Sequence, residues 1–138
     1  MRQLSLAAAL LASPLLAAPA PPPQVLAETE VPEGHGQQAV TQLIRVFPVG
    51  GSSGWHSHPG IELGHVLAGV TDMRLADGTS HRYAAGQSFT IPRGVVHNGV
   101  NAGRVPARLL VTYIIDKGAP QRIEAPAPEG LWPPDFKK

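Results

Sequence analysis

The sequence contains no cysteine and few aromatic residues. The absence of cysteine excludes both a disulfide framework and a lipid attached through a cysteine thiol. Aromatic residues make up only 5% of the 138 residues, whereas hydrophobic residues of all kinds make up 43%. We therefore expect one domain with a mainly aliphatic core. Without disulfides, a small domain relies on its core, on a bound metal or on a partner subunit.

Concentrated charge of one sign is also lacking. The chain has 11 lysine and arginine residues against 10 aspartate and glutamate residues, which gives a formal net charge of +1. The basic residues form no run or stripe, so the sequence lacks the electrostatic surface that nucleic acids require. Nothing indicates a basic helix on a membrane surface either. Nucleic acid is therefore excluded as an expected partner.

The N-terminal segment has no charged residue between Arg2 and Glu28. Its apolar run is short and interrupted by prolines, so it suits neither a membrane span nor a buried helix. A basic start, a short apolar run and small residues are typical of a secretory signal peptide. We expect residues 1–27 to be this peptide, with cleavage after Ala27, or alternatively after Ala20. The mature protein would then be periplasmic or extracellular and would have no membrane anchor.

From Val40 onward the sequence shows the alternation and the turn residues of short β-strands, and no sustained helical period. Asp77-Gly78 is the strongest hairpin signal, because this pair favours a two-residue turn. Many short strands at regular spacing predict an antiparallel sandwich or barrel over residues 40–116. The strands are expected at residues 40–47, 55–58, 62–67, 70–75, 79–83, 87–91, 95–100 and 107–115.

The two segments beside this region have little strand signal. Residues 28–39 form a polar N-terminal arm, and residues 117–138 form a C-terminal tail with several prolines. The prolines predict that the tail is extended or irregular. The side chains of Trp132 and Phe136 need an apolar surface, either on the barrel or on a second subunit, unless the tail is disordered.

Four side chains of the β-rich region have the residue types and the spacing of a metal site. His56 and His58 lie two residues apart, so an extended strand places both on one face. Glu62 keeps the same parity if the strand resumes after the intervening bend, and His97 lies on a later strand. Three imidazoles and one carboxylate suit Fe(II), Mn(II), Ni(II), Co(II) or Zn(II), and the ligand types do not choose among these ions.

These residues belong to two motifs that resemble the two conserved motifs of the cupin superfamily. The first reads Gly50-x5-His56-x-His58-x3-Glu62-x6-Gly69. The second reads Gly86-x5-Pro92-x-Gly94-x2-His97-x3-Asn101. Every fixed position is matched, and the resemblance extends from Val40 to Asp116, which makes the signal specific.

The resemblance implies a small single-domain cupin, an all-β jelly-roll β-barrel that holds one divalent transition metal ion inside. Carried over by position, the four ligands would be His56, His58, Glu62 and His97. Four motif glycines would lie at strand ends, where turns commonly require positive φ angles: Gly50, Gly69, Gly86 and Gly94. Pro92 would end its strand and aim His97 inward, and Asn101 would bond to the backbone in a turn.

Three further residues are candidates for substrate binding. Gly64 follows Glu62 at even spacing, so it should face inward, where a glycine either leaves room for a ligand or allows tight strand packing. His65 stands where an aromatic residue is common in the family, although its parity points away from the metal. Tyr83 is a candidate acid or base that no spacing forces into the cavity. Glu62 could itself move a proton while it ligates the metal.

The ligand set and the resemblance favour a mononuclear-metal enzyme that acts on a small organic molecule. Its chemistry would be dioxygenase-like oxidation or that of an isomerase, lyase or decarboxylase. The alternative is a non-catalytic cupin module that binds a sugar or another small molecule, since fold membership does not prove chemistry. Cupin barrels often pair, so the resemblance also implies a homodimer, with the C-terminal tail or the segment before Val40 as the exchanged element.

Overall fold

The computed structural model describes residues 36–132 of the chain. The predicted signal peptide, residues 28–35 of the predicted arm, and residues 133–138 with Phe136 lie outside this range. The described residues form nine strands: β1 (Gln38–Phe47), β2 (His56–Ser57), β3 (Gly60–Ala68), β4 (Val70–Leu75), β5 (Ser80–Ala84), β6 (Ser88–Ile91), β7 (His97–Val100), β8 (Ala107–Asp116) and β9 (Ile123–Glu124).

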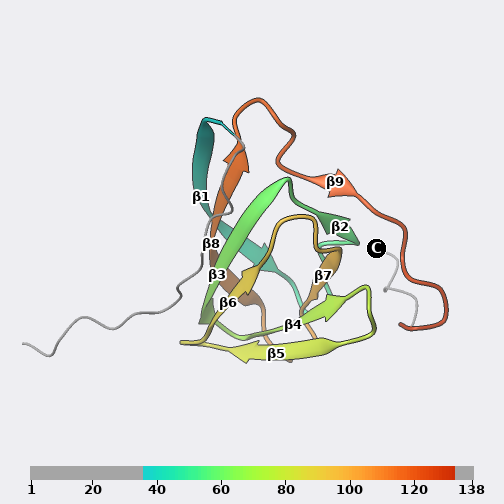
Figure 1. Ribbon diagram of the computed structural model, residues 1–138. Coiled ribbons are helices and arrows are strands. Elements are labelled where there is room, and N and C mark those ends of the chain that lie inside the picture. The colour runs from blue at the N-terminus through green and yellow to red at the C-terminus, as the bar shows by residue number, and fades with distance from the viewer. Residues whose placement is uncertain (1–35, 133–138) are drawn as a thin grey trace, which may run out of the picture.

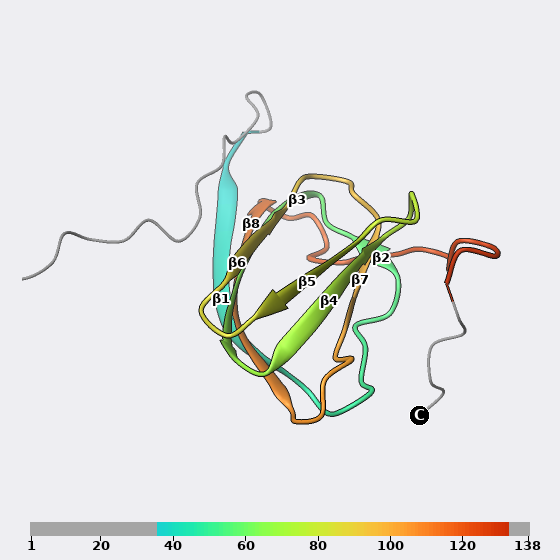
Figure 2. The same cartoon turned by 90° about the horizontal axis from the view of Figure 1, so that it is seen from below.

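The strands form two antiparallel sheets that face each other (Figure 1). One sheet has four strands in the order β1-β8-β3-β6, and the other has five in the order β5-β4-β7-β2-β9. In Figure 2 the four-stranded sheet lies to the left of β4, β7 and β2 of the other sheet. The expectation of an all-β antiparallel barrel is confirmed. Within residues 36–132 no helix is long and apolar enough to cross a membrane.

The observed strands begin and end close to the predicted positions, because glycine, proline and the Asp-Gly pair interrupt them. β4 has the predicted bounds, and β6 ends at Ile91, directly before Pro92. The Asp77-Gly78 turn joins β4 to β5, with Gly78 at a φ of 90°. Four motif glycines have the expected positive φ, between 73° and 88°: Gly50, Gly69, Gly86 and Gly94.

The core lies between the sheets, where inward side chains alternate with outward ones. β8 shows this pattern clearly, since Leu109, Val111 and Tyr113 are buried and the residues between them are more exposed. Phe47 on β1 and Val66 on β3 belong to the same buried cluster. This alternation is the two-residue period of a strand. It brings side chains of β1, β3 and β8 into the interior of the barrel.

Asn101 has the structural role expected of it. Its side chain is fully buried, with 0% exposure, and its amide nitrogen lies 3.0 Å from the Phe47 oxygen and 2.9 Å from the Val105 oxygen. Its side-chain oxygen accepts a hydrogen bond from the Gly103 N–H at 2.9 Å. A buried amide whose hydrogen bonds are satisfied in this way ties the end of β1 to the loop after β7.

The C-terminal segment folds back onto the barrel after β8. Figure 1 shows it passing above the beginning of β3 before it reaches β9, which pairs with β2. The N–H of Ala125 donates to the Trp55 carbonyl at 3.1 Å, which continues this pairing. The tail is extended here, as the prolines predict, but β9 makes it part of the five-stranded sheet.

Trp132 at the end of the described range packs on this same barrel. Its ring centroid lies 6.4 Å from that of Trp55, and its Nε1–H donates to the Leu75 carbonyl at 3.2 Å. The Arg74 guanidinium lies 5.2 Å from the centroid of the Trp132 ring. Of the alternatives considered for this side chain, packing on the barrel is confirmed, and a disordered tail is wrong for the residues up to Trp132.

Candidate metal centre

The four predicted ligands meet between the two sheets. His56 lies on β2, His58 follows β2 directly, and His97 begins β7, so the five-stranded sheet and its adjoining loop supply three imidazoles. Glu62 lies on β3 of the facing sheet. One nitrogen or oxygen atom from each residue lies within 4.8 Å of those from the other three. All four residues are buried, with exposed fractions between 1% and 5%.

Backbone pairing between the two motifs explains why these residues meet. His56 stands opposite His97 in the pairing of β2 with β7, so both rings start from neighbouring positions. The N–H of Gly94 donates to the His58 carbonyl at 2.9 Å, which attaches the turn after β6 to the end of β2. The turn that follows Pro92 therefore delivers His97 to the other ligands.

Each histidine ring is held by a backbone carbonyl through its Nδ1 atom. This nitrogen lies 2.8 Å from the Gly54 oxygen in His56, 2.9 Å from the Val95 oxygen in His97, and 2.5 Å from the Gln121 oxygen in His58. A carbonyl oxygen only accepts, so Nδ1 carries the proton and Nε2 of the neutral ring keeps its lone pair. Metal-binding histidines typically have this arrangement.

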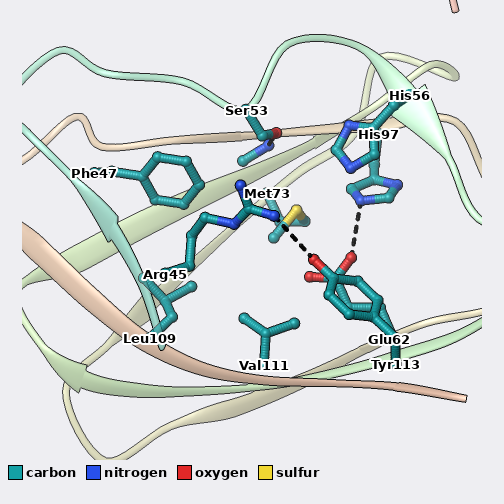
Figure 3. Close-up of a pocket in the computed structure, with 11 residues that line it drawn as sticks. Arg45, Phe47, Ser53, His56, Glu62, Met73, His97, Leu109, Val111 and Tyr113 are labelled. Atoms are coloured by element: carbon teal, nitrogen blue, oxygen red, sulfur yellow. Dashed lines mark hydrogen bonds and ion pairs between the residues drawn. The ribbon is translucent and has the colours of Figure 1, made fainter. Parts of the chain in front are cut away.

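The free Nε2 atoms of two rings face Glu62. Nε2 of His58 lies 2.9 Å and Nε2 of His97 lies 3.2 Å from Glu62 Oε2 (Figure 3 shows the His97 contact). Within residues 36–132, His58 Nε2 and Glu62 Oε2 are buried and have no hydrogen-bond partner. Two such atoms facing each other are costly unless a cation lies between them. The donor set of three nitrogens and one oxygen therefore fits a divalent transition metal ion.

Burial and mutual charge keep these groups in the forms that bind a cation. Burial lowers the pKa of His56 from 6.5 to about 4, although its hydrogen bond to the Gly54 carbonyl acts in the opposite direction. Burial raises the pKa of Glu62, but hydrogen bonds and positive charge from His58 and His97 rings protonated at Nε2 would lower that pKa to about 2, and a cation held between the same atoms acts in the same direction. At neutral pH, His56 is therefore uncharged and Glu62 is ionised.

A small cavity adjoins the cluster, and Arg45 and Tyr113 lie in it beside Glu62 (Figure 3). Its volume is about 20 Å³, which is room for about one water molecule. Arg45 Nη2 donates to the Tyr113 hydroxyl at 3.5 Å, and the Tyr113 ring centroid lies 4.8 Å from that of His58. Burial and the charge of Glu62 raise the pKa of Tyr113, so its hydroxyl stays protonated at neutral pH.

Arg45 and Tyr113 are not among the site residues predicted from the sequence. The sequence does contain one signal for Arg45. It lies on the same inward-facing side of β1 as the apolar Leu43 and Phe47, and a charged residue is unusual on such a side. Tyr113 carries no such signal, since an aromatic residue at an inward position of a long strand is what a core strand contains.

The structure does not bring the three substrate-binding candidates to the cavity. Gly64 faces inward, but the Phe89 ring covers it, so that a Cβ atom at this position would lie 2.0 Å from Phe89 Cζ. His65 lies on the opposite face of β3, with its Nδ1 atom 2.9 Å from Ser88 Oγ. Tyr83 packs against the Phe89 ring, with ring centroids 5.2 Å apart. Gly64 serves strand packing, which was the alternative to ligand space.

We expect the Gly64→Ala substitution to lower the free energy of unfolding by about 2–3 kcal/mol, because an added methyl group overlaps the buried Phe89 ring. Gly99→Ala is the matched control, since a Cβ atom there would meet its nearest neighbour, Met73 Cε, at an ordinary 3.5 Å. Chemical denaturation of both variants measures the difference. Equal stability of the two variants would contradict the packing role of Gly64.

The fold and the cluster together define a class of protein, an antiparallel two-sheet β-barrel with three histidines and one glutamate converging in its interior. Residues 43–113 match the family model described as "Cupin domain". This match covers about half of the chain and contains all four cluster residues, and the chain belongs to the cupin domain family.

Individual relatives match between 61% and 70% of the chain. Germin-like protein 9-2 of Oryza sativa subsp. japonica is 35% identical over 89 residues, which are 61% of this chain and 41% of that protein. The DMSP lyase DddQ from Ruegeria pomeroyi DSS-3 superposes with a TM-score of 0.56 at 23% identity, over 66% of this chain and 45% of the lyase. This chain therefore spans less than half the length of either protein.

A conserved protein with a double-stranded β-helix domain from Klebsiella pneumoniae has a more similar size. It superposes with a TM-score of 0.56 at 20% identity, over 70% of this chain and 90% of that protein. Similarities at this level of identity show the common fold, which is the two-sheet barrel described above.

Proposed function

We propose that this protein binds one divalent transition metal ion through His56, His58, Glu62 and His97, and that it is a mononuclear-metal enzyme for a small organic molecule. The observation that carries the proposal is the convergence of four buried donor groups, two of whose facing atoms, His58 Nε2 and Glu62 Oε2, lack hydrogen-bond partners within residues 36–132. Assembling these groups in a buried site without a cation would be costly. A cluster of this kind is therefore difficult to explain as part of a scaffold.

A bound ion of this kind supplies Lewis-acid or dioxygen chemistry, and the residues around it would position the substrate. The carbonyls that hold the histidine Nδ1 atoms fix the ring orientations in advance. The buried apolar side chains of Leu109 and Val111 line the cavity and disfavour water in it. The protonated Tyr113 hydroxyl and the Glu62 carboxylate are the groups that could give or accept a proton near the substrate.

The size of the cavity favours an enzyme for small molecules over a sugar-binding module. With a volume of about 20 Å³, the space beside Glu62 admits one small group, whereas pockets for whole ligands commonly measure about 300–1,000 Å³. A sugar ring would therefore remain outside, away from the four donor groups. The proposed substrate enters only with a small polar end.

Metal content tests the proposal directly. We expect stoichiometric metal in wild-type protein produced with Fe, Mn, Ni, Co or Zn in turn, as measured by elemental analysis. His58→Ala should lose this metal, whereas His81→Ala should keep it, because His81 lies exposed on β5, away from the cluster. A wild type without stoichiometric metal under every supply would refute the proposal. Oxygen uptake and product analysis on the loaded protein then separate an enzyme from a binding module.

We also infer that the protein acts after export and that two barrels pair. Export rests on the signal-like segment before Glu28, and N-terminal sequencing of protein recovered outside the cytoplasm tests it. Pairing is supported by exposed apolar side chains on the outer side of β1, among them Val40 and Val46 with 68% and 56% exposure. A solution mass that corresponds only to the monomer would refute pairing.

A further inference from the structure

Arg45 on β1 extends into the barrel beside the candidate metal centre (Figure 3). Its neighbours Ile44 and Val46 are exposed, at 45% and 56%, whereas Arg45 itself is half-buried. Within residues 36–132 its side chain contacts the Tyr113 hydroxyl, and no carboxylate pairs with it. A guanidinium that extends into a cavity keeps N–H donors that an anion entering the cavity can use. The position of Arg45 therefore points to an anionic ligand.

The hydrogen-bond donors that Arg45 and Tyr113 do not use between themselves suit a planar anion. The guanidinium has five N–H donors in a rigid fork, and the contact with Tyr113 uses one of them. The Tyr113 oxygen accepts that hydrogen bond, so its own O–H is left to donate to a ligand. A carboxylate matches both arms of the guanidinium fork and can accept a further hydrogen bond from the phenol.

The position of Arg45 also suggests the direction from which the ligand arrives. Arg45, Phe47 and Ser53 line the inner cavity and also a larger hollow at the surface, of about 350 Å³. Arg45 thus contributes to the lining of both the outer hollow and the inner cavity of about 20 Å³. Only a small group fits inside, and the rest of the ligand would lie in the hollow.

We propose that Arg45 and Tyr113 form a carboxylate-binding subsite at the mouth of the metal cavity, and that the natural ligand is a small organic acid in its anionic form. This inference deepens the proposed function and rests on it. With a divalent ion on the three neutral imidazoles and Glu62, the cavity carries net positive charge, which the carboxylate of the substrate reduces.

Acetate is the smallest probe that carries the required group, and acetamide is its neutral counterpart. In calorimetric titrations of the metal-loaded protein, we expect Arg45→Met to weaken acetate binding by about 10- to 100-fold, because a charge-assisted hydrogen-bonded contact is lost. Tyr113→Phe should weaken it by about 3- to 10-fold, as expected for one neutral donor. Acetamide should bind more weakly than acetate and should not respond to Arg45→Met.

Arg108→Met is the matched control. Arg108 lies on β8 opposite Val46, so it is close to Arg45 in the same sheet, but it is exposed on the outer side. This variant should bind acetate as the wild type does. Equal acetate binding by Arg45→Met and Arg108→Met would overturn the subsite. If inorganic phosphate bound as tightly as acetate and depended equally on Arg45, the assignment to carboxylates would be overturned.

Elemental analysis of every variant separates this inference from the proposed function. Arg45 is not among the four donors, so Arg45→Met should retain the metal content of the wild type. Normal metal content together with acetate binding that is independent of Arg45 would refute the subsite alone. If the wild type held no metal, the proposed function would fail, and acetate binding that still depended on Arg45 would support the subsite by itself.

Discussion

A Glu62→Gln variant is expected to bind metal more than about 100-fold more weakly than the wild type while it keeps the same fold. The amide has the shape of the carboxylate, so the β3 backbone and the core around it need not move. Removal of a group that only orients a metal ligand already lowers metal affinity by about 10- to 100-fold. Removal of a ligand itself should lower the affinity further, which sets the lower limit given above.

The physical reason lies in the charge of the cluster. Glu62 supplies its one anion, because burial keeps His56 neutral and the pKa of Glu62 is lowered to about 2. Its Oε2 atom also lies 2.9 Å from His58 Nε2 and 3.2 Å from His97 Nε2. A neutral amide would leave a buried divalent ion without a compensating charge.

Glu124→Gln provides the control for this experiment. Glu124 lies on β9 opposite His56, but its side chain is exposed and pairs with Arg122. Competition with a chelating dye measures the affinity of both variants, and circular dichroism checks their fold. If Glu62→Gln bound metal as tightly as Glu124→Gln, the cluster would not be the metal centre.

Much of the architecture could be predicted from local patterns. Strand alternation, the Asp77-Gly78 turn and Pro92 lie within single segments of the chain, and their effects do not depend on distant residues. The spacing of His56 and His58 likewise fixes a shared orientation. These features explain why the strand bounds and the shared face of His56 and His58 follow from local sequence, whereas the full set of four donors follows from the resemblance to the two motifs.

Other features depend on contacts between residues far apart in the chain, which local patterns do not encode. The space beside Gly64 is filled by Phe89, which faces it across the pairing of β3 with β6. Arg45 and Tyr113 meet because β1 pairs with β8, and neither belongs to a motif. The contact of Gln121 with His58 uses a backbone oxygen, so the identity of the side chain gives no signal.

That backbone contact leads to a second large expected effect, the loss of metal affinity when the C-terminal segment is removed. A chain truncated after Gly118 lacks Gln121, whose carbonyl oxygen accepts the hydrogen bond from Nδ1 of His58. It also lacks β9, which pairs with β2, the strand that carries His56. We expect the affinity for metal to fall by about 10- to 100-fold, as for other groups that orient ligands without touching the metal.

Truncation after Trp132 is the control, because it keeps every contact described above for the tail. Trp132 covers Trp55, which is only 6% exposed. The chain has 2 tryptophans, so fluorescence of the shorter variant reports on Trp55 alone, and we expect its emission to shift towards that of an exposed indole. The metal affinities of the two truncated proteins are compared at a temperature at which circular dichroism shows that both are folded.

The two readouts distinguish orientation of the ligand from general stability. If the segment only covered apolar surface, truncation after Gly118 would shift the Trp55 emission and leave the affinity of the folded protein unchanged. If it orients His58, truncation after Gly118 changes both the Trp55 emission and the metal affinity. The metal affinity of Trp132→Ala should then lie between those of the two truncated proteins, because this variant keeps Gln121 but loses the packing on Trp55. Unchanged metal affinity in the folded variant truncated after Gly118 would show that the His58 ring is held by β2 and its neighbours without the tail.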